Sequence, residues 1–172
     1  MDDRSTCSPL WRAASIVIVA MMLSGCAALH WHRSHPGQGE LLLYYPKTDG
    51  RTLVPYGAPL PVQTDLPHLA RAVVATVLAG PELGVSAVRF PAGTLARSVT
   101  LEGSVATVDL SQGIEATPAG GFAENAEFKA LVWSLTALPG ITQVQIRVAG
   151  QRISTLPGGH FELDEPLSRS DW

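Results

Sequence analysis

Apolar residues recur at helical spacing in two segments of the chain. In the first, successive intervals of three and one residues create one broad apolar face between residues 66 and 78. Thr64 or Asp65 can cap the start of this helix, and Gly80-Pro81 provides a stop. The second segment, residues 123–138, carries its apolar stripe at Phe128, Leu131, Val132, Leu135 and Leu138. The pattern therefore predicts two amphipathic helices.

Short runs with strand character lie on both sides of these helices. Residues 40–45 and 51–55 flank an Asp49-Gly50 turn and predict one hairpin, and residues 98–101 and 105–110 alternate around Glu102-Gly103 and predict a second. The strands predicted after the second helix are residues 141–148 and 152–156. The predicted order ββαββαββ favours an α+β fold, a two-layer sandwich with two helices packed on one face of a largely antiparallel sheet.

The N-terminal segment differs from the rest of the chain. Residues 13–23 form an uninterrupted apolar run of 11 residues, which is too short to span a bilayer and has the length of a secretory signal core. The residues Leu23-Ser24-Gly25-Cys26 that close it resemble the lipobox of bacterial lipoproteins. The alternatives are a short uncleaved anchor or a buried core strand.

The lipobox resemblance implies that residues 1–25 are a cleaved signal peptide. Cys26 would then carry an S-diacylglycerol and an N-acyl group, and removing the first 25 of 172 residues leaves 147. Residues 26–39 end in a Pro/Gly segment and are predicted to be a flexible tether, and residues 40–172 the folded domain. The tether contains His30, His32 and His35, for which a weak metal site is the alternative to a polar linker.

Cysteine usage and charge exclude several classes of function. Cys7 would leave with the signal peptide and Cys26 would carry lipid, so the mature chain has no disulfide and no cysteine-based zinc site. The net charge is −3 and the basic residues are scattered singly, without the basic stripe typical of nucleic-acid binding. The Glu102-Gly103 loop lacks a phosphate-binding glycine pattern, and no cofactor is predicted.

With these elements placed, the chain resembles a GerMN domain, the module of bacterial sporulation and spore-germination proteins that also occurs in envelope lipoproteins. The matching stretches follow the order of the family and cover nearly all of residues 40–171. They are Leu43-Tyr44-Tyr45-Pro46, Asp49-Gly50, Leu53-Val54-Pro55, Leu78-Ala79-Gly80-Pro81, Gly103-Ser104-Val105-Ala106-Thr107-Val108-Asp109-Leu110-Ser111, Val132-Trp133-Ser134-Leu135-Thr136, Leu138-Pro139-Gly140 with Val144, and Glu165-Pro166-Leu167-Ser168-Arg169. One departure is that family members often carry an arginine shortly after Leu-Val-Pro, whereas residues 56–62 contain none.

The resemblance implies a fold, an envelope location and an interaction role, and it carries no catalytic residues. The expected function is that of a non-enzymatic, lipid-anchored envelope protein that binds a protein partner or a cell-wall component. If the cell has two membranes, Ala27 favours the outer one, facing the periplasm, because the aspartate that commonly retains lipoproteins in the inner membrane is absent after Cys26.

The alternative function is an envelope hydrolase that acts on peptidoglycan. Such an enzyme needs an activated nucleophile, paired acids or a metal centre. Outside the tether the candidates are His68, His160 and Asp109, together with an acidic tail containing Glu162, Asp164 and Glu165. We expect His68 and the tail acids to face solvent. Asp109 ends a strand, and its position fits a cap of the turn at residues 111–113 as well as it fits a catalytic role. No catalytic residue is predicted.

Overall fold

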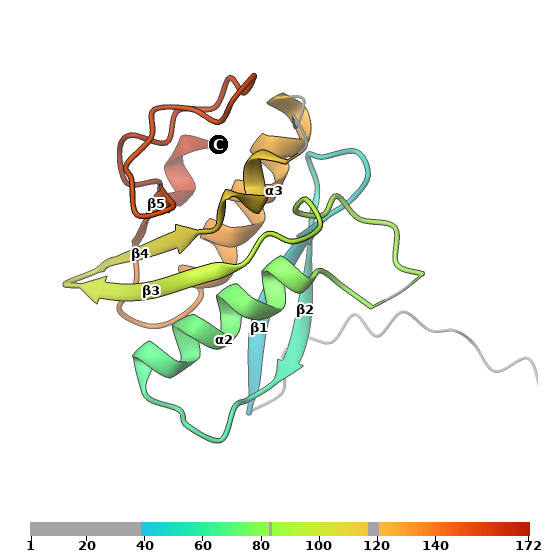
Figure 1. The fold of residues 1–172 in the computed structure, drawn as a ribbon. Coiled ribbons are helices and arrows are strands. Elements are labelled where there is room, and N and C mark those ends of the chain that lie inside the picture. Colours follow the sequence, from blue (N-terminus) through green and yellow to red (C-terminus); the bar gives the residue numbers. More distant parts are fainter. Residues whose placement is uncertain (1–38, 83, 117–120) are drawn as a thin grey trace, which may run out of the picture. The chain divides into compact units, whose positions relative to one another are not determined.

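The computed structural model describes residues 39–82, 84–116 and 121–172. The expected signal peptide, Cys26 and the three tether histidines lie outside the described residues. Within them, the elements occur in the order β1 (Glu40–Pro46), β2 (Leu53–Pro59), α2 (Leu66–Ala79), β3 (Ala96–Glu102), β4 (Val105–Leu110), η1 (Gln112–Glu115), α3 (Gly121–Leu135), β5 (Gln143–Val148) and η2 (Arg169–Asp171) (Figure 1). The predicted α+β class is confirmed, with both helices close to their expected positions.

The strands form two sheets rather than one. β1 and β2 form an antiparallel hairpin, and β3, β4 and β5 form a second sheet in that order. β5 runs parallel to β4, because the 15-residue helix α3 returns the chain to the end of the sheet at which β4 begins. Both helices contact β1, and each also contacts the second sheet, α2 at β3 and α3 at β5. The helices therefore join the two sheets through one core.

The sixth predicted strand is not present as a strand. After β5, Val148 and Gln151 exchange both backbone hydrogen bonds across a turn, in which Ala149 and Gly150 have positive φ. The chain then crosses the outer side of β5, where the Gln145 amide nitrogen donates to the Leu163 carbonyl and its oxygen accepts from Arg152. Gln145, which the alternation of the strand places on a wet face, is therefore only 3% exposed.

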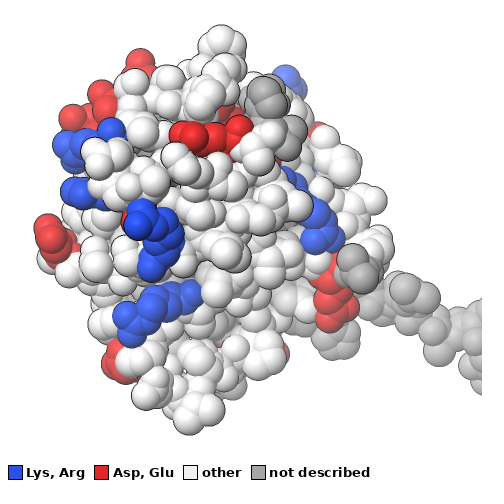
Figure 2. All heavy atoms as spheres, in the orientation of Figure 1, with Lys and Arg blue, Asp and Glu red and all other residues white. Residues whose placement is uncertain are grey.

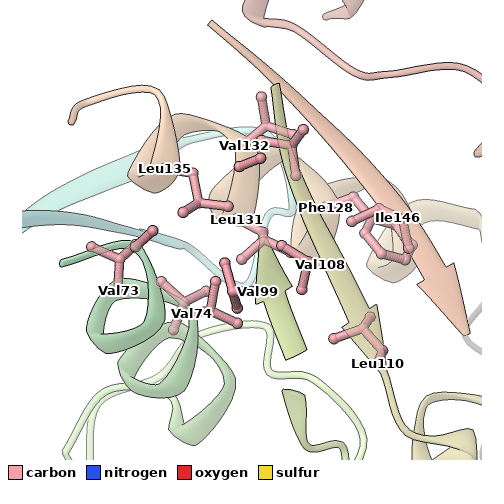
Figure 3. Close-up of a cluster of buried hydrophobic side chains, with 14 of the residues drawn as sticks. Val73, Val74, Val99, Val108, Leu110, Phe128, Leu131, Val132, Leu135 and Ile146 are labelled. Atoms are coloured by element: carbon pink, nitrogen blue, oxygen red, sulfur yellow. The ribbon is translucent and has the colours of Figure 1, made fainter. Parts of the chain in front are cut away.

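One continuous hydrophobic core holds the domain together (Figure 3). The apolar faces predicted for α2 and for the β3–β4 hairpin are buried, with Val73, Val74, Val108 and Leu110 at 0% exposure. The C-terminal segment adds Leu156, Leu163 and Leu167 to this core, and Leu167 forms an antiparallel bridge with Val144. The tail is thus docked through its apolar residues.

Helix capping and turn chemistry follow the sequence closely. The Asp65 side chain accepts the His68 N–H at 3.1 Å at the start of α2, and the last turn ends at Gly80 with φ of 77°. In the first hairpin, Asp49 accepts the Arg51 and Thr52 N–H groups, which lowers the pKa of Asp49 to about 2. Gly50 has φ of 60°, which favours glycine, and a Cβ at this position would displace the exposed Phe122 ring.

Both edges of the first sheet are protected. On β1, the Tyr44 N–H donates to the Ser134 hydroxyl of α3 at 2.9 Å, and this hydroxyl donates to the Ala130 carbonyl at 2.7 Å. On β2, Pro55 and Pro59 stand opposite Tyr44 and Glu40 in the register, at alternate positions whose N–H would point away from β1. Because proline has no N–H, the free edge of this sheet is poorly suited to accept another strand.

We predict that Ser134→Ala lowers the free energy of unfolding by about 1–3 kcal/mol, because it leaves the Tyr44 N–H without its acceptor inside the domain. Urea denaturation followed by tryptophan fluorescence measures the change. The control is Ser86→Ala, which removes a hydroxyl from an exposed loop position and should leave the unfolding midpoint unchanged. Equal midpoints for the two variants would contradict the proposed link between α3 and β1.

Candidate functional sites

Asp109 connects the turn after β5 to β3 and does not cap the turn that follows it in the chain. Its Oδ1 accepts the Gly150 N–H at 2.7 Å, and its Oδ2 lies 3.2 Å from Arg97 Nη1. Asp109 therefore does not cap residues 111–113. The Ser111 side chain does not cap this turn either, because its hydroxyl accepts the Leu95 N–H and donates to the Gly93 carbonyl in the loop before β3. Asp109 thus ties the turn after β5 to the bulged start of β3.

The two histidines named as hydrolase candidates also have local roles. His68 Nδ1 lies 2.6 Å from Asp65 Oδ2, and both side chains are substantially exposed at the start of α2. His160 is exposed, and its backbone N–H points to Glu124. The tail acids Glu162, Asp164 and Glu165 are exposed, as expected. Among the described residues, no group of three or more His, Cys, Asp or Glu side chains is arranged to hold a metal ion.

Two buried carboxylates on α3 were missed by the sequence reasoning. Glu124 and Glu127 are 0% and 3% exposed, and their spacing of three residues places them on one face of the helix. Glu124 Oε2 accepts the His160 N–H at 3.3 Å, while Glu124 Oε1 and Glu127 Oε2 have no hydrogen-bond partner within the described part of the chain. Gly159 packs directly on Glu124, since a Cβ at that position would lie 2.5 Å from both carboxylate oxygens.

The surroundings of this pair favour its protonated form. Burial raises the pKa of Glu127 to about 8, and the neighbouring Glu124 adds to the rise. Burial also raises the pKa of Glu124, although the facing backbone of His160 and the His160 charge oppose the rise. A raised carboxyl pKa is typical of a general acid, but a general acid must reach its substrate. The carboxylates face the interior, so the geometry is that of a buried structural pair.

A signal for these residues was present in the sequence. Acids near the start of a helix are typical of residues that complement the helix dipole, which is one interpretation of Glu124 and Glu127. However, Glu124 precedes Phe128 by four residues and Glu127 precedes Leu131 by four, so both acids lie in line with the apolar stripe. Helical spacing alone therefore placed them on the buried face.

The solvent-facing side of α3 presents aromatic rings covered by cations. We call this surface, formed by Tyr44, Lys129, Trp133, Arg169 and Trp172, the α3 surface. Lys129 Nζ lies 5.3 Å from the Trp133 ring centroid, and Arg169 Cζ lies 5.6 Å from the same ring and 5.9 Å from that of Tyr44. The rings of Trp133 and Trp172 meet edge to face at 5.4 Å. Trp133 packs against an edge of the core and is also the central ring of this cluster.

The docked C-terminus fixes the geometry of the α3 surface. Arg169 Nε donates to the Thr136 hydroxyl at 2.8 Å, and Arg169 Nη2 donates to the Trp133 carbonyl at 3.0 Å. Trp172 Nε1 donates to Asn125 at 2.9 Å. In the described part of the chain, neither Lys129 nor Arg169 forms an ion pair with a carboxylate. The surface therefore presents two positive charges for which the described residues provide no carboxylate partner.

The fold and these sites define a small α+β domain with a docked tail, an inaccessible acid pair and an aromatic surface. Residues 42–154, which are 113 of the 172 residues, match the family model described as Germane: Sporulation and spore germination. The chain belongs to this family. The match covers the two hairpins, both helices and β5.

Solved structures share the fold. The first GerMN domain of the sporulation protein GerM from Bacillus subtilis is 22% identical with a TM-score of 0.59, over 76% of this chain and 98% of that one. The tandem GerMN domains of the same protein are 21% identical with a TM-score of 0.59, and this chain spans 45% of their length. A Clostridium perfringens protein described as a candidate lipoprotein is 20% identical with a TM-score of 0.57, over 80% and 93% of the two chains. No curated protein matches the chain.

Across residues 39–82, 84–116 and 121–172, no helix has both the length and the apolar character needed to cross a membrane. The relatives are proteins with GerMN domains.

We predict that the free energy of unfolding falls as the pH rises from about 5 to about 8, and that Glu127→Gln makes this dependence shallower. The folded pKa of about 8 lies above the usual value near 4.5, so the native state binds the additional proton in this range. The slope should approach about 1.4 kcal/mol per pH unit for one proton. Urea titrations at several pH values measure it.

Glu165→Gln is the control for this titration, because Glu165 is an exposed tail acid. It should leave the slope unchanged. Parallel pH profiles for the unmodified protein and Glu127→Gln would mean that the Glu127 carboxyl is not held protonated by the fold.

Proposed function

We propose that the chain is a non-enzymatic lipoprotein of the cell envelope, anchored through lipid on Cys26, whose domain binds a protein partner or a cell-wall component. The observation that carries the binding role is the α3 surface, where two cations without an ion-pair partner among the described residues lie over tryptophan and tyrosine rings. Trp, Tyr and Arg are the residues that most often dominate binding energy at interfaces. The outer membrane, facing the periplasm, is the proposed location in a cell with two membranes.

The chemistry of the α3 surface favours an anionic partner. Lys129 and Arg169 are held in place by their contacts with the Arg51 and Trp133 carbonyls, so little side-chain order has to be imposed on binding. Carboxylates or phosphates on the partner would complete the charge pairs, with Arg169 suited to two-point contacts. Cell-wall carboxylates and acidic protein surfaces both offer such groups.

Hydrolysis of peptidoglycan is the weaker proposal. The candidate groups serve separate structural contacts: Asp109 with Arg97 and Gly150, and His68 with Asp65. Glu124 and Glu127 form a close acid pair, yet both lie on the interior face of α3. Incubation with peptidoglycan distinguishes the two proposals, because an enzyme releases soluble fragments whereas a binding protein co-sediments with the polymer unchanged.

We predict that cells supplied with a clickable fatty acid label the protein, and that Cys26→Ala abolishes the label. The label depends on Cys26 because the lipid is expected on its thiol and on the new amine. Several acyl chains hold a protein stably at a bilayer. Gel fluorescence after click reaction measures it. Label that persists in Cys26→Ala, or no label in the unmodified protein, contradicts the anchor.

We predict that Lys129→Gln with Arg169→Gln weakens binding to the physiological partner by about tenfold or more, because both charges of the α3 surface are lost. The partner is first captured by crosslinking the lipidated protein in the envelope, and its affinity is then compared between variants.

The matched control is Arg71→Gln with Arg147→Gln. This pair removes the same charge from exposed residues of α2 and β5. Equal loss of binding in both double variants would indicate a general charge effect and would contradict a specific role for the α3 surface.

A further inference from the structure

An uncharged apolar end distinguishes the first sheet and the loop that follows it. Residues 53–64 contain no Asp, Glu, Lys or Arg. This segment holds three of the five large hydrophobic residues exposed in the described part of the chain, with Tyr56 at 36%, Leu60 at 39% and Val62 at 103% exposure. The Val62 side chain therefore does not pack against the core, although valine is usually buried.

This end of the domain is also where the chain leads toward Cys26. Glu40, the first residue of β1, stands opposite Pro59 in the register of the hairpin. Leu60, Pro61 and Val62 follow directly after Pro59, so the start of β1 and the apolar loop lie at one end of the first sheet (Figure 1). We call Leu60 and Val62, with the prolines around them, the β2–α2 tip.

Few charged side chains surround the tip on the face that Figure 2 draws, although β1 begins at Glu40 at this end. In the same orientation, Figure 2 shows the end of the domain below α2 as mostly uncharged, with acidic and basic side chains in small separate groups elsewhere on this face. The charged residues that bracket the segment in sequence are Arg51 and Asp65. The tip is therefore suited to an apolar contact and lacks the cations that anionic headgroups attract.

We propose that the β2–α2 tip contacts the lipid bilayer that carries the Cys26 anchor, with Leu60 and Val62 inserted at the headgroup boundary. This inference rests on the proposed lipid anchor. The 14 residues from Cys26 to Gly39 have a root-mean-square span of about 20 Å as a flexible chain. The tether thus keeps this end of the domain close to the membrane surface, where even a weak apolar contact becomes populated.

A second copy of the chain is a less suitable occupant. Pairing through the free edge of β2 would need outward N–H donors, and Pro55 and Pro59 remove two of them. A zwitterionic lipid surface has no strand edge to pair and meets the apolar loop without this cost.

The test places an environment-sensitive nitrobenzoxadiazole dye at Val62→Cys in the full-length lipidated protein, reconstituted in phosphatidylcholine vesicles that contain spin-labelled lipid. The matched control carries the dye at Leu95→Cys, an exposed hydrophobic position at 66% exposure in the loop before β3. We expect at least twofold stronger quenching by lipid at position 62 than at position 95. We also expect Leu60→Asn to reduce quenching at position 62.

The outcomes separate this inference from the proposed anchor. Protein that lacks lipid and does not float with vesicles overturns the anchor and the membrane contact together. Protein that floats with vesicles but shows equal quenching at positions 62 and 95 overturns the contact alone. Equal near-ultraviolet circular dichroism of both labelled proteins verifies that the domain is folded, as expected for substitutions at exposed positions.

Discussion

The hydrogen bond from the Tyr44 N–H to the Ser134 hydroxyl joins β1 to α3, the helix that connects the first sheet to the second. A two-stranded hairpin is marginally stable in water, so β1 and β2 depend on what covers them. Helix α3 provides that cover, because it contacts β1 on one side and β5 on the other. The Ser134 hydroxyl accepts the outward-facing N–H of Tyr44 at the edge of β1. The same hydroxyl donates to the Ala130 carbonyl, which holds its side chain against α3. The stretch Trp133-Ser134-Leu135-Thr136 therefore combines an aromatic surface residue, an edge cap, a core residue and a contact for Arg169.

Local structure could be predicted from the sequence wherever one short-range rule decided it. The Asp65 cap, the Asp49-Gly50 turn and the buried face of the β3–β4 hairpin follow from neighbouring residues alone. The features that could not be predicted depend on long-range contacts. β5 is parallel to β4 because of the path of α3, and Gln145 is buried because residues far along the chain cross β5. Residues 152–156 have strand character but lack an available edge, since Val144 is paired with Leu167.

The candidate sites divide in the same way. Asp109 was recognised as an unusual carboxylate, but its partners, Arg97 and Gly150, lie on different elements and only the fold brings them together. Glu124 and Glu127 could have been recognised by their position in line with Phe128 and Leu131. A charged carboxylate at such a position is costly unless it is paired or protonated. Close packing by Gly159 accompanies burial that raises the pKa of both acids, so the fold favours their protonated forms. The absence of an arginine in residues 56–62 leaves this part of β2 and the loop after it without a basic side chain of its own.

The same absence has a second consequence, because it leaves residues 53–64 free of charge on the outer side of the first sheet. A charge there would favour water and oppose an apolar contact with lipid. The α3 surface has the opposite character, since its cations are exposed and unneutralised within the described residues. An anchored protein needs both kinds of surface, one that tolerates the membrane and one that remains available to a partner in solution. The proposed membrane contact would also limit rotation about the tether, so that the α3 surface is presented to its partner in a restricted set of orientations, which reduces the entropy lost on binding.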